Sequence, residues 1–288
     1  MSQSPSPKPS PDCPPEAQPG FGLIIVGDEI LSGKRADKHM VKVIELLAAR
    51  GLQLSWVEYV GDAPGLITRT LRRAFDSGDI VFSCGGIGAT PDDHTRQCAA
   101  RALGVPLALH PQARALIRER MRDIALEQGV PFEPERADNV HRLNMGVFPL
   151  GARIIPNPYN KIPGFSCEGM AAGAVYFVPG FPVMAWPMVE SVLDTHYSHR
   201  FEAGAWAEQS VIVFGAMESA LTPLMERLES EHAGIKVFSL PSVDHPDFGR
   251  HIELGVKGRP ALVVPAFDAM VRGLRQLNVK MGPELVRK

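Results

Sequence analysis

Short apolar runs alternate with one-sided helical patterns along residues 21–84. The runs at 23–26, 52–60 and 79–84 are predicted to be buried strands. A helix with one buried face is predicted after each of the first two strands, because apolar residues recur there at helical spacing. The predicted inward residues are Met40, Val43, Ile44 and Leu47 in the first helix, which ends at Gly51, and Ile67, Leu71, Ala74 and Phe75 in the second, which begins at Pro64. Strands joined by such crossovers predict a parallel sheet and therefore an α/β fold.

The middle of the chain is less regular. Residues 111–128 have helical spacing. The polar, proline-containing stretch 131–139 is predicted to be a connection over the edge of the site, where Arg142 is a candidate ligand. Residues 151–158 and 174–182 each predict a strand that ends in a proline-containing turn, and a helix is predicted over 183–193.

A second, smaller α/β domain is predicted over residues 207–288. Its apolar pattern predicts strands at 211–214, 235–238 and 251–256, and helices at 219–230 and 266–277. The sequence Gly-Val-Lys-Gly at 255–258 is similar to the GxxG clamp of KH domains, but that clamp lies between two helices, whereas this one follows a predicted strand. We therefore interpret it as a β-turn.

Composition narrows the classes of function. The chain has 288 residues, 45% of them hydrophobic, which is enough for the cores of a large domain at 21–200 and a small one at 207–288. Residues 1–20 are dominated by Pro and Ser and are predicted to be a disordered leader. The formal charge of −2 argues against a nucleic acid or an anionic membrane as the partner, so small molecules are the expected ligands.

The sequence also indicates a compartment. It shows no signal peptide and no run of about 18 apolar residues that would predict a membrane-spanning helix. The four cysteines, Cys13, Cys84, Cys98 and Cys167, are scattered without a CxxC pair, which is typical of reduced thiols. We expect a cytoplasmic protein in which Cys84 and Cys98 are small buried residues.

The glycine-rich stretch after the strand at 79–84 is the most informative segment. Gly85, Gly86 and Gly88 allow a tight turn with exposed N–H groups, and the helix predicted to follow, headed by acids, would add its own N-terminal N–H groups. This is a candidate phosphate cradle, although similar turns are common without a ligand. The next polar residues are Thr90, Asp92, Asp93 and Thr95, whose hydroxyls and carboxylates can hold a cation or position a water molecule.

Two other predicted strands end in Val-Gly-Asp, at 26–28 and 60–62. Ligands of open parallel sheets bind beyond the carboxyl ends of the strands, so Asp28, Glu29 and Asp62 are expected near the glycine turn. Ordinary helix caps or Asx-turns are the alternative. The chain has no GxGxxG with a downstream acid, GxxxxGK[ST], HExxH or GxSxG motif, which disfavours dinucleotide hydride transfer, P-loop catalysis, zincin chemistry and a nucleophile elbow.

Taken together, these motifs resemble a known family. The matching segments are Gly-Asp-Glu-Ile-Leu-Ser-Gly at 27–33, Val-Gly-Asp at 60–62, Gly-Gly-Ile-Gly-Ala-Thr-Pro-Asp-Asp-His-Thr at 85–95, Asn157-Pro158 with Pro-Gly-Phe at 163–165, and Pro-Gly-Phe-Pro at 179–182. They resemble the molybdopterin-binding (MoaB/Mog-like) domain of competence/damage-inducible protein A over roughly residues 22–195, and Phe214-Gly215 and Glu218-Ser219 extend the likeness. The resemblance implies a three-layer α/β/α domain with a mostly parallel sheet, and we expect a homo-oligomer, a dimer or a trimer.

The resemblance also implies chemistry. Similar domains include molybdopterin adenylyltransferases, a module fused to FAD synthetases, and members that hydrolyse ADP-ribose or FAD at the pyrophosphate with a divalent metal. By motif position, the acids that matter in the adenylyltransferases correspond to Asp62 and Asp93, the expected catalytic residues. The candidate residues for binding a molybdopterin or nucleotide phosphate are Gly27, Asp28, Glu29, Ser32, Gly85, Gly86, Gly88, Thr90, Thr95, Asn157 and Gly180, and those for Mg²⁺ or a similar metal are Asp28, Asp92 and Asp93.

The chain departs from the family pattern at a few positions. Ala89 stands where a proline is usual, His39 where an asparagine is usual, and Val183-Met184 where Ser-Glu is usual. No region is left for the C-terminal domain that deamidates nicotinamide mononucleotide in longer relatives, so we expect that activity to be missing. Three hypotheses stay open. The protein is a metal-dependent nucleotide pyrophosphatase or an adenylyltransferase-like enzyme of molybdenum cofactor biosynthesis, a non-catalytic binding module for a pterin or nucleotide, or a scaffold whose cleft is vestigial.

Overall fold

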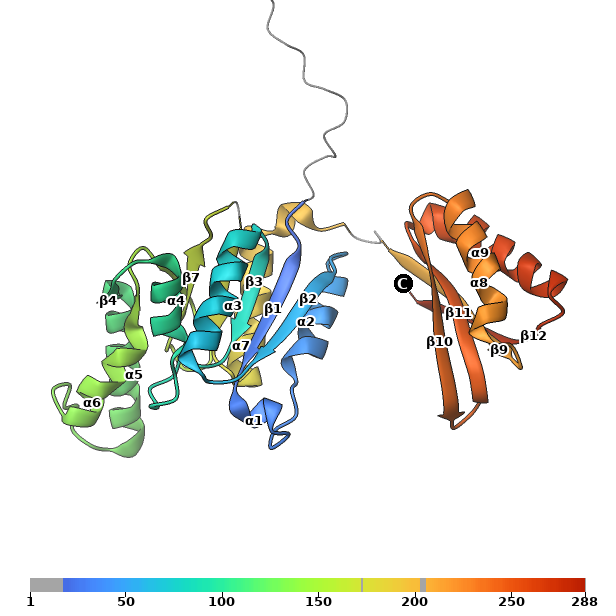
Figure 1. The fold of residues 1–288 in the computed structure, drawn as a ribbon. Coiled ribbons are helices and arrows are strands. Elements are labelled where there is room, and N and C mark those ends of the chain that lie inside the picture. The colour runs from blue at the N-terminus through green and yellow to red at the C-terminus, as the bar shows by residue number, and fades with distance from the viewer. Residues whose placement is uncertain (1–17, 172, 203–205, 288) are drawn as a thin grey trace, which may run out of the picture. The chain divides into compact units, whose positions relative to one another are not determined.

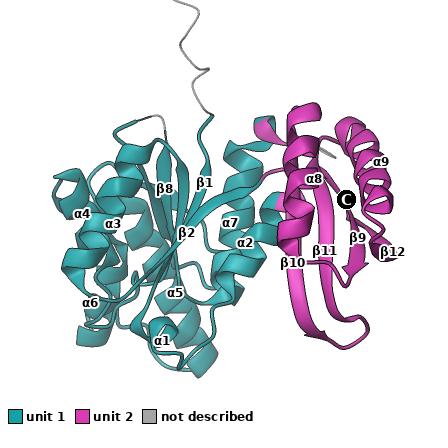
Figure 2. Ribbon diagram, turned by 45° about the vertical axis from the view of Figure 1, so that its right-hand side comes forward, with its two compact units in different colours: residues 1–47, 53–199 teal, residues 48–52, 200–288 magenta. Residues whose placement is uncertain are grey.

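The computed structural model describes residues 18–171, 173–202 and 206–287. These residues form two compact units, drawn in two colours in Figure 2. One unit contains the chain up to Leu47 and Gln53–His199, and the other contains Ala48–Leu52 and the chain from Arg200 onward. The predicted leader lies outside the described residues except for residues 18–20.

A six-stranded mixed sheet forms the centre of the first unit (Figure 1). Its strands, in spatial order, are β2 (Leu54–Val60), β1 (Phe21–Val26), β3 (Ile80–Cys84), β8 (Ala174–Val178), β7 (Gly164–Glu168) and β6 (Arg153–Ile155). The first four pair in parallel. β7 is antiparallel to β8 and β6 is antiparallel to β7, so β6 runs in the same direction as the first four strands. The predicted strands at the start of the chain and the parallel sheet are confirmed, and β7 is an additional strand.

Helices cover both faces of this sheet. The helices of the unit are α1 (Asp28–Leu31), α2 (His39–Ala48), α3 (Pro64–Ser77), α4 (Thr95–Leu103), α5 (Pro111–Gln128), α6 (Ala137–Arg142) and α7 (Pro182–His196), with a small antiparallel pair of β4 (Leu107–Leu109) and β5 (Val147–Pro149). Figure 2 shows α3 and α4 on one face and α2 and α7 on the other. The predicted three-layer α/β/α architecture is confirmed.

Local sequence explains the best-predicted helix, α3. Pro64 occupies its first turn, where a missing N–H costs nothing, and Gly78 ends it in the left-handed conformation. Its predicted inward residues are all buried against the sheet. Beneath it, the rings of Phe165 and Phe177 stack with their centres 4.3 Å apart. Truncating such a buried Phe to Ala typically costs about 3–5 kcal/mol of stability.

The predicted inward face of α2 is partly wrong. Val43 and Leu47 are buried, but Ile44 is 44% exposed and Leu46 is buried in its place. Apolar residues occupy almost every position from Val41 to Leu47, so the local pattern does not fix how the helix is rotated about its axis. Packing against the sheet decides that rotation.

Two predictions around the glycine turn are also corrected. The helix after the turn is not headed by acids, because α4 begins at Thr95 with His94 as its N-cap and has no acid in its first turn. Asp92 and Asp93 therefore precede the helix and belong to the loop. The predicted connection over 131–139 is a loop as far as residue 136, and its last residues belong to the short helix α6, which begins at Ala137 after a cap at Arg136.

The second unit is a four-stranded antiparallel sheet with two helices in one core. Its elements, in chain order, are β9 (Ala207–Phe214), α8 (Glu218–Glu231), β10 (Ile235–His245), β11 (Gly249–Gly258), α9 (Pro260–Gln276) and β12 (Lys280–Arg287). The sheet order β10-β11-β9-β12 and the β-α-β-β-α-β sequence are those of a ferredoxin-like split βαβ motif. The predicted small α/β domain is confirmed, with α9 longer than predicted and β12 in addition.

The β-turn predicted at 255–258 is wrong, because these residues form the end of β11. Gly255 pairs with Ser210, and a Cβ on it would come within 2.2 Å of the Phe238 ring. This glycine makes room for an aromatic ring from the neighbouring strand.

The cysteines that the structure describes are buried, and none of the described helices could cross a membrane. Cys84 and Cys98 are buried free thiols, as predicted, and so is Cys167, whereas Cys13 lies outside the described residues. Burial raises the pKa of Cys167 to about 12. Across the described ranges, every helix is too short or too polar to cross a bilayer.

Candidate functional site

Loops that follow five strands surround one cavity at the carboxyl edge of the six-stranded sheet. The strands are β1, β2, β3 and β8, which pair in parallel, and β6, which runs in the same direction because β7 is antiparallel to both of its neighbours. The cavity has a volume of 410 Å³. The predicted site residues that line it are Gly27, Glu29, Asp62, Gly85, Gly86, Gly88, Thr90, Asp92, Asp93, Asn157 and Gly180.

The turn after β3 requires residues without a Cβ. Gly85 and Gly86 have φ values of 106° and 69°, in the left-handed region. A Cβ on Gly86 would lie 2.1 Å from Thr95 Oγ1. Thr95 itself is buried, and its hydroxyl donates to the carbonyl of Gly85 at 3.1 Å. The structure therefore places this predicted ligand behind the turn, where it fastens the turn to α4, and outside the cavity lining.

The two Val-Gly-Asp strand ends hold each other. The N–H of Asp28 donates to Asp62 Oδ2 at 2.9 Å, and the N–H of Asp62 donates to Asp28 Oδ1 at 3.1 Å. Asp62 lines the cavity. Asp28, the first residue of α1, and Ser32, its C-cap, lie outside the lining. Burial raises the pKa of Asp62, the N–H of Asp28 partly lowers it, and the charges of Asp28, Glu29 and Asp92 raise it further.

Asp93 builds the far end of the glycine turn. Its Oδ2 accepts a hydrogen bond from the N–H of Thr90 at 2.8 Å and a second from the Thr90 hydroxyl. Its Oδ1 has no hydrogen-bond partner within the described part of the chain. One carboxylate oxygen is thus structural, and the other is available to the cavity that Asp93 lines.

Two side chains, Asn157 and His39, hold the wall of the cavity that the loops after β6 and β8 form. Asn157 donates from Nδ2 to Asn160 Oδ1 at 2.8 Å and to the carbonyl of Ile162 at 2.9 Å, so its amide shapes the loop after β6. Gly180 accepts at its carbonyl from Nε2 of the buried His39, at 3.1 Å. His39, which stands in place of the expected asparagine, therefore ties the start of α2 to the loop after β8.

Arg35 and Phe181 line the cavity without having been predicted from the sequence. The guanidinium carbon of Arg35 lies 5.8 Å from the centre of the Phe181 ring, and its Nη1 lies 3.9 Å from Glu29 Oε1. Phe181 belongs to the Pro-Gly-Phe-Pro motif, which was a usable signal. Arg35 had none, because a polar residue in a loop reads the same whether it faces solvent or a cavity.

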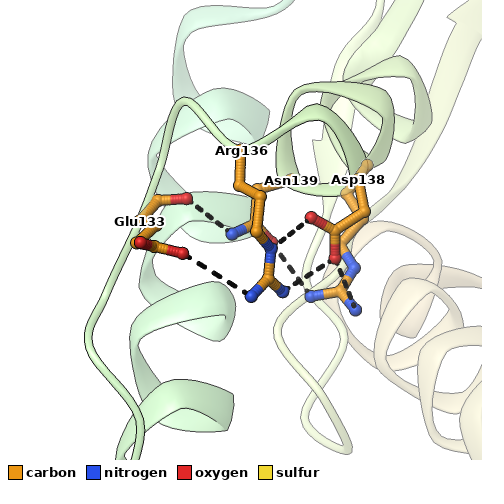
Figure 3. A network of polar contacts seen from close by, with 5 residues as sticks. Glu133, Arg136, Asp138 and Asn139 are labelled. Carbon is orange, nitrogen blue, oxygen red and sulfur yellow. Dashed lines mark hydrogen bonds and ion pairs between the residues drawn. The ribbon is translucent and has the colours of Figure 1, made fainter.

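Arg142, the candidate ligand near α6, takes part in a separate polar network. Figure 3 shows the guanidinium of Arg136 between the carboxylates of Glu133 and Asp138. The hydrogen bonds from Arg136 are the main cause that lowers the pKa of Asp138 to about 2. Arg142 donates from Nη1 to Asn139 Oδ1 at 3.1 Å and does not line the cavity.

The charge of the cavity restricts what it can bind. Its charged lining residues are the acids Glu29, Asp62, Asp92 and Asp93 and the base Arg35. A phosphate would be repelled there unless a cation shared the cavity. Among the residues with a described position, no three His, Cys, Asp or Glu side chains are grouped so that they hold a metal ion by themselves. Because Mg²⁺ is commonly held by one or two carboxylates plus ligand phosphates, these acids fit a metal that binds together with a phosphate.

Similarity to known proteins agrees with this geometry. Residues 22–199 match the family described as "probable molybdopterin binding domain". Protein TV0584 of Thermoplasma volcanium is 30% identical over 219 residues, which cover 76% of this chain and 79% of that protein. A CinA-like protein of Gloeobacter violaceus is 34% identical over 164 residues, which cover 57% of this chain and 36% of that longer protein.

A solved structure supports the fold of the same region. The crystal structure of the protein CinA with unknown function from Thermoplasma acidophilum aligns with a TM-score of 0.51 and 27% identity, covering 61% of this chain and 96% of that one. The resemblance read from the motifs is thus confirmed at the level of the family. With the match spanning the whole six-stranded domain and its glycine turn, the chain belongs to the family of probable molybdopterin-binding domains.

Proposed function

We propose that the cavity binds the phosphate of a pterin or nucleotide, and that the protein cleaves or transfers at a pyrophosphate linkage of that ligand with a divalent metal ion. The observation that carries the proposal is the meeting, in one cavity, of the glycine turn with carboxylates from the ends of β2 and β3. A phosphate-binding backbone and metal-binding carboxylates are the two parts that pyrophosphate chemistry needs.

The glycine turn supplies the donors for the phosphate. The N–H of Gly85 is already used, because it donates to the carbonyl of Val178 at 3.0 Å. Within the described chain, the N–H groups of Gly86 and Gly88 meet no acceptor. Unpaired N–H groups of neighbouring turn residues can form a concave anion-binding surface. The ligand phosphate is therefore assigned to the part of the turn between Gly86 and Gly88.

The carboxylates supply the other part. Asp62 and Asp92 are the acids that would hold the metal ion against the bound phosphate, together with the free Oδ1 of Asp93. Asp28, a metal candidate from the sequence, instead keeps the backbone of Asp62 in place. A bound divalent cation would polarise the phosphate oxygens and balance the acidic lining.

In the hydrolytic form of the reaction, a water oxygen bonds to one phosphorus while the bridging oxygen leaves with the other. Asp93 is placed to orient that water through Oδ1, since Oδ2 is fixed by Thr90. In the transfer form, a hydroxyl or phosphate of a second substrate takes the place of the water. Both forms use the same phosphate cradle, so substrate screening separates them.

The deciding experiment offers ADP-ribose, FAD and an adenylylated pterin to the purified protein and, in a separate incubation, ATP together with molybdopterin. Each is run with Mg²⁺, Mn²⁺, Co²⁺ or no metal, and chromatography follows AMP release and pterin adenylylation. Metal-dependent AMP release supports the pyrophosphatase. Formation of an adenylylated pterin from ATP and molybdopterin supports the adenylyltransferase-like alternative. Binding of a pterin or nucleotide without turnover refutes catalysis and leaves the binding module, and absence of both refutes the proposal altogether.

The metal and the phosphate are expected to bind together. In calorimetric titrations, Mg²⁺ should bind weakly to the protein alone, because no three ligating side chains are grouped among the residues that the structure describes. It should bind at least about tenfold more tightly in the presence of ADP. Equal Mg²⁺ affinity with and without ADP, after correction for the Mg²⁺ bound by free ADP, contradicts this arrangement.

A homo-oligomer, dimer or trimer, is part of the same proposal and rests on the family resemblance. Sedimentation equilibrium measures it directly. A monomer at all concentrations tested contradicts it.

A further inference from the structure

Arg96 is a buried cation that forms no ion pair with any carboxylate of the described residues. It lies in the first turn of α4 and is only 4% exposed. Its Nη2 donates to the carbonyl of Gly88 at 2.6 Å, while its Nε has no acceptor among the residues that the structure describes. The charge of Asp93 acts on it from beyond ion-pair distance, and burial lowers the pKa of the guanidinium.

Each feature of this position disfavours an isolated positive charge. A buried guanidinium loses its hydration and normally requires a paired anion. The N-terminal end of a helix is itself partly positive, and α4 has no acid in its first turn to balance it. An anion that contacts the guanidinium of Arg96 would relieve both costs.

A separate cavity lies at this side chain, behind the glycine turn. It has a volume of 290 Å³, and its polar lining comprises Thr90, Asp93, His94, Arg96, Gln97, His141 and Asn144. Arg96 lines this cavity and does not line the larger one, with which it shares Ala89, Thr90 and Asp93 as a wall. Access to Arg96 is therefore from the back of the turn.

His141 connects this cavity to the turn. Its Nε2 donates to the carbonyl of Ala89 at 3.0 Å, and its Nδ1 accepts from Asn144 Nδ2 at 3.3 Å. Both ring nitrogens are thus used by a neutral imidazole. The charged groups of the lining are Arg96 and the carboxylate of Asp93, which lies beyond ion-pair distance, and His94 is a further titratable group.

We propose that this second cavity binds a free oxyanion of the phosphate class on Arg96 and the N-terminal end of α4. Arginine at a helix N-terminus is a combination that suits a tetrahedral oxyanion, because the guanidinium and the N–H groups of the first turn offer several donors. The anion would also stiffen the glycine turn, since Arg96 holds the carbonyl of Gly88. This site is independent of the function proposed for the larger cavity.

The test is a calorimetric titration of the full chain with inorganic phosphate at constant ionic strength. Two matched variants each place one negative charge in one cavity: Asn144→Asp in the second cavity and Asn160→Asp in the larger one. At residue 160, Asp keeps the hydrogen bonds that the side chain accepts from Asn157 and Ile162. At residue 144, Asp loses the bond that Asn144 donates to His141, so the melting temperature of each variant is measured beside its phosphate affinity. We expect a binding component that Asn144→Asp weakens by about tenfold or more and that Asn160→Asp changes by less than about threefold.

Arg96 variants separate charge from structural support. Arg96→Lys should retain phosphate binding within about tenfold, whereas Arg96→Gln should abolish the rise in melting temperature that phosphate causes in the wild type. A purely structural arginine would lower the melting temperature equally with and without phosphate. The proposal is overturned if phosphate does not bind, if Asn160→Asp is the variant that weakens it, or if Arg96→Gln keeps the full phosphate-dependent rise.

Discussion

Replacing Asp93 with Asn removes one negative charge from the cavity and leaves the shape of the side chain almost unchanged. The amide oxygen of Asn can still accept the hydrogen bonds that Thr90 donates to Oδ2. The oxygen at Oδ1, which accepts no hydrogen bond in the described chain, becomes either an NH₂ group or an uncharged oxygen. The change therefore tests the free oxygen of Asp93 and largely spares the turn.

The expected loss of stability is small. Hydrogen bonds to a charged group contribute about 1.5–3 kcal/mol, compared with about 0.5–1.5 kcal/mol for neutral ones, and solvent exposure at the cavity mouth reduces that difference. We expect Asp93→Asn to cost about 1 kcal/mol, which lowers the melting temperature of a domain of this size by about 2–4 °C. The protein stays folded at assay temperature.

The expected loss of turnover is much larger. A group that orients water or charge in the transition state typically contributes on the order of 10²–10³ in rate, or about 2.7–4 kcal/mol. We expect that loss in metal-dependent AMP release from the best substrate, with nucleotide binding retained in part through the backbone of Gly86 and Gly88. Binding should persist because those N–H groups do not depend on the charge of residue 93.

The assay compares wild type, Asp93→Asn and the control Asp76→Asn, which removes the same charge from an exposed position on α3. Single-turnover AMP release, calorimetric affinity for ADP with Mg²⁺ and melting temperature are measured on each. Wild-type turnover in Asp93→Asn refutes the assigned role. A rate loss that appears equally in Asp76→Asn attributes the effect to total charge.

Two further changes test the turn and the acid at the end of β2. Gly86→Ala should lower the free energy of unfolding in urea by about 2 kcal/mol or more, because residue 86 has φ 69° and a Cβ would lie 2.1 Å from the Thr95 hydroxyl. The control Gly65→Ala, in the open first turn of α3, should be neutral or stabilising. Equal effects of the two variants would contradict this geometry. Asp62→Asn should raise the melting temperature at pH 7 while lowering turnover, because the raised pKa of Asp62 means that its ionised form opposes folding above its ordinary value of 3.8. The gain should vanish as the pH falls below that value, and a lower melting temperature at pH 7 than wild type would contradict the sign.

The sequence by itself determined the architecture and the place of the candidate site. The alternation of apolar runs with one-sided helical spacing is local, so it could be read as parallel strands with crossover helices. Once the strands are parallel, their carboxyl ends must share an edge, which explains why the glycine turn and Asp62 were expected together and lie in one cavity. The glycines were informative because glycine adopts positive φ values more readily than any other residue type, and Gly85 and Gly86 do so here.

The tertiary structure alone decided which polar groups face the cavity. Asp28 and Asp62 follow identical Val-Gly motifs, and each carboxylate accepts a hydrogen bond from the backbone N–H of the other residue. Only Asp62 lines the cavity. Thr95 was expected to face a ligand and instead fastens the turn from behind. These outcomes depend on which donor another loop brings within hydrogen-bonding distance, and no spacing along one segment encodes that.

The same limit applies to burial. Nothing in the pattern around residue 96 distinguishes its arginine from an exposed one, and nothing around residues 41–47 fixes which side of α2 meets the sheet. Burial is set by the elements that pack over a residue, and for Arg96 one of those elements is the glycine turn, where the carbonyl of Gly88 accepts its hydrogen bond. Periodicity reports a local preference, whereas the desolvation of a charge is a property of the assembled fold.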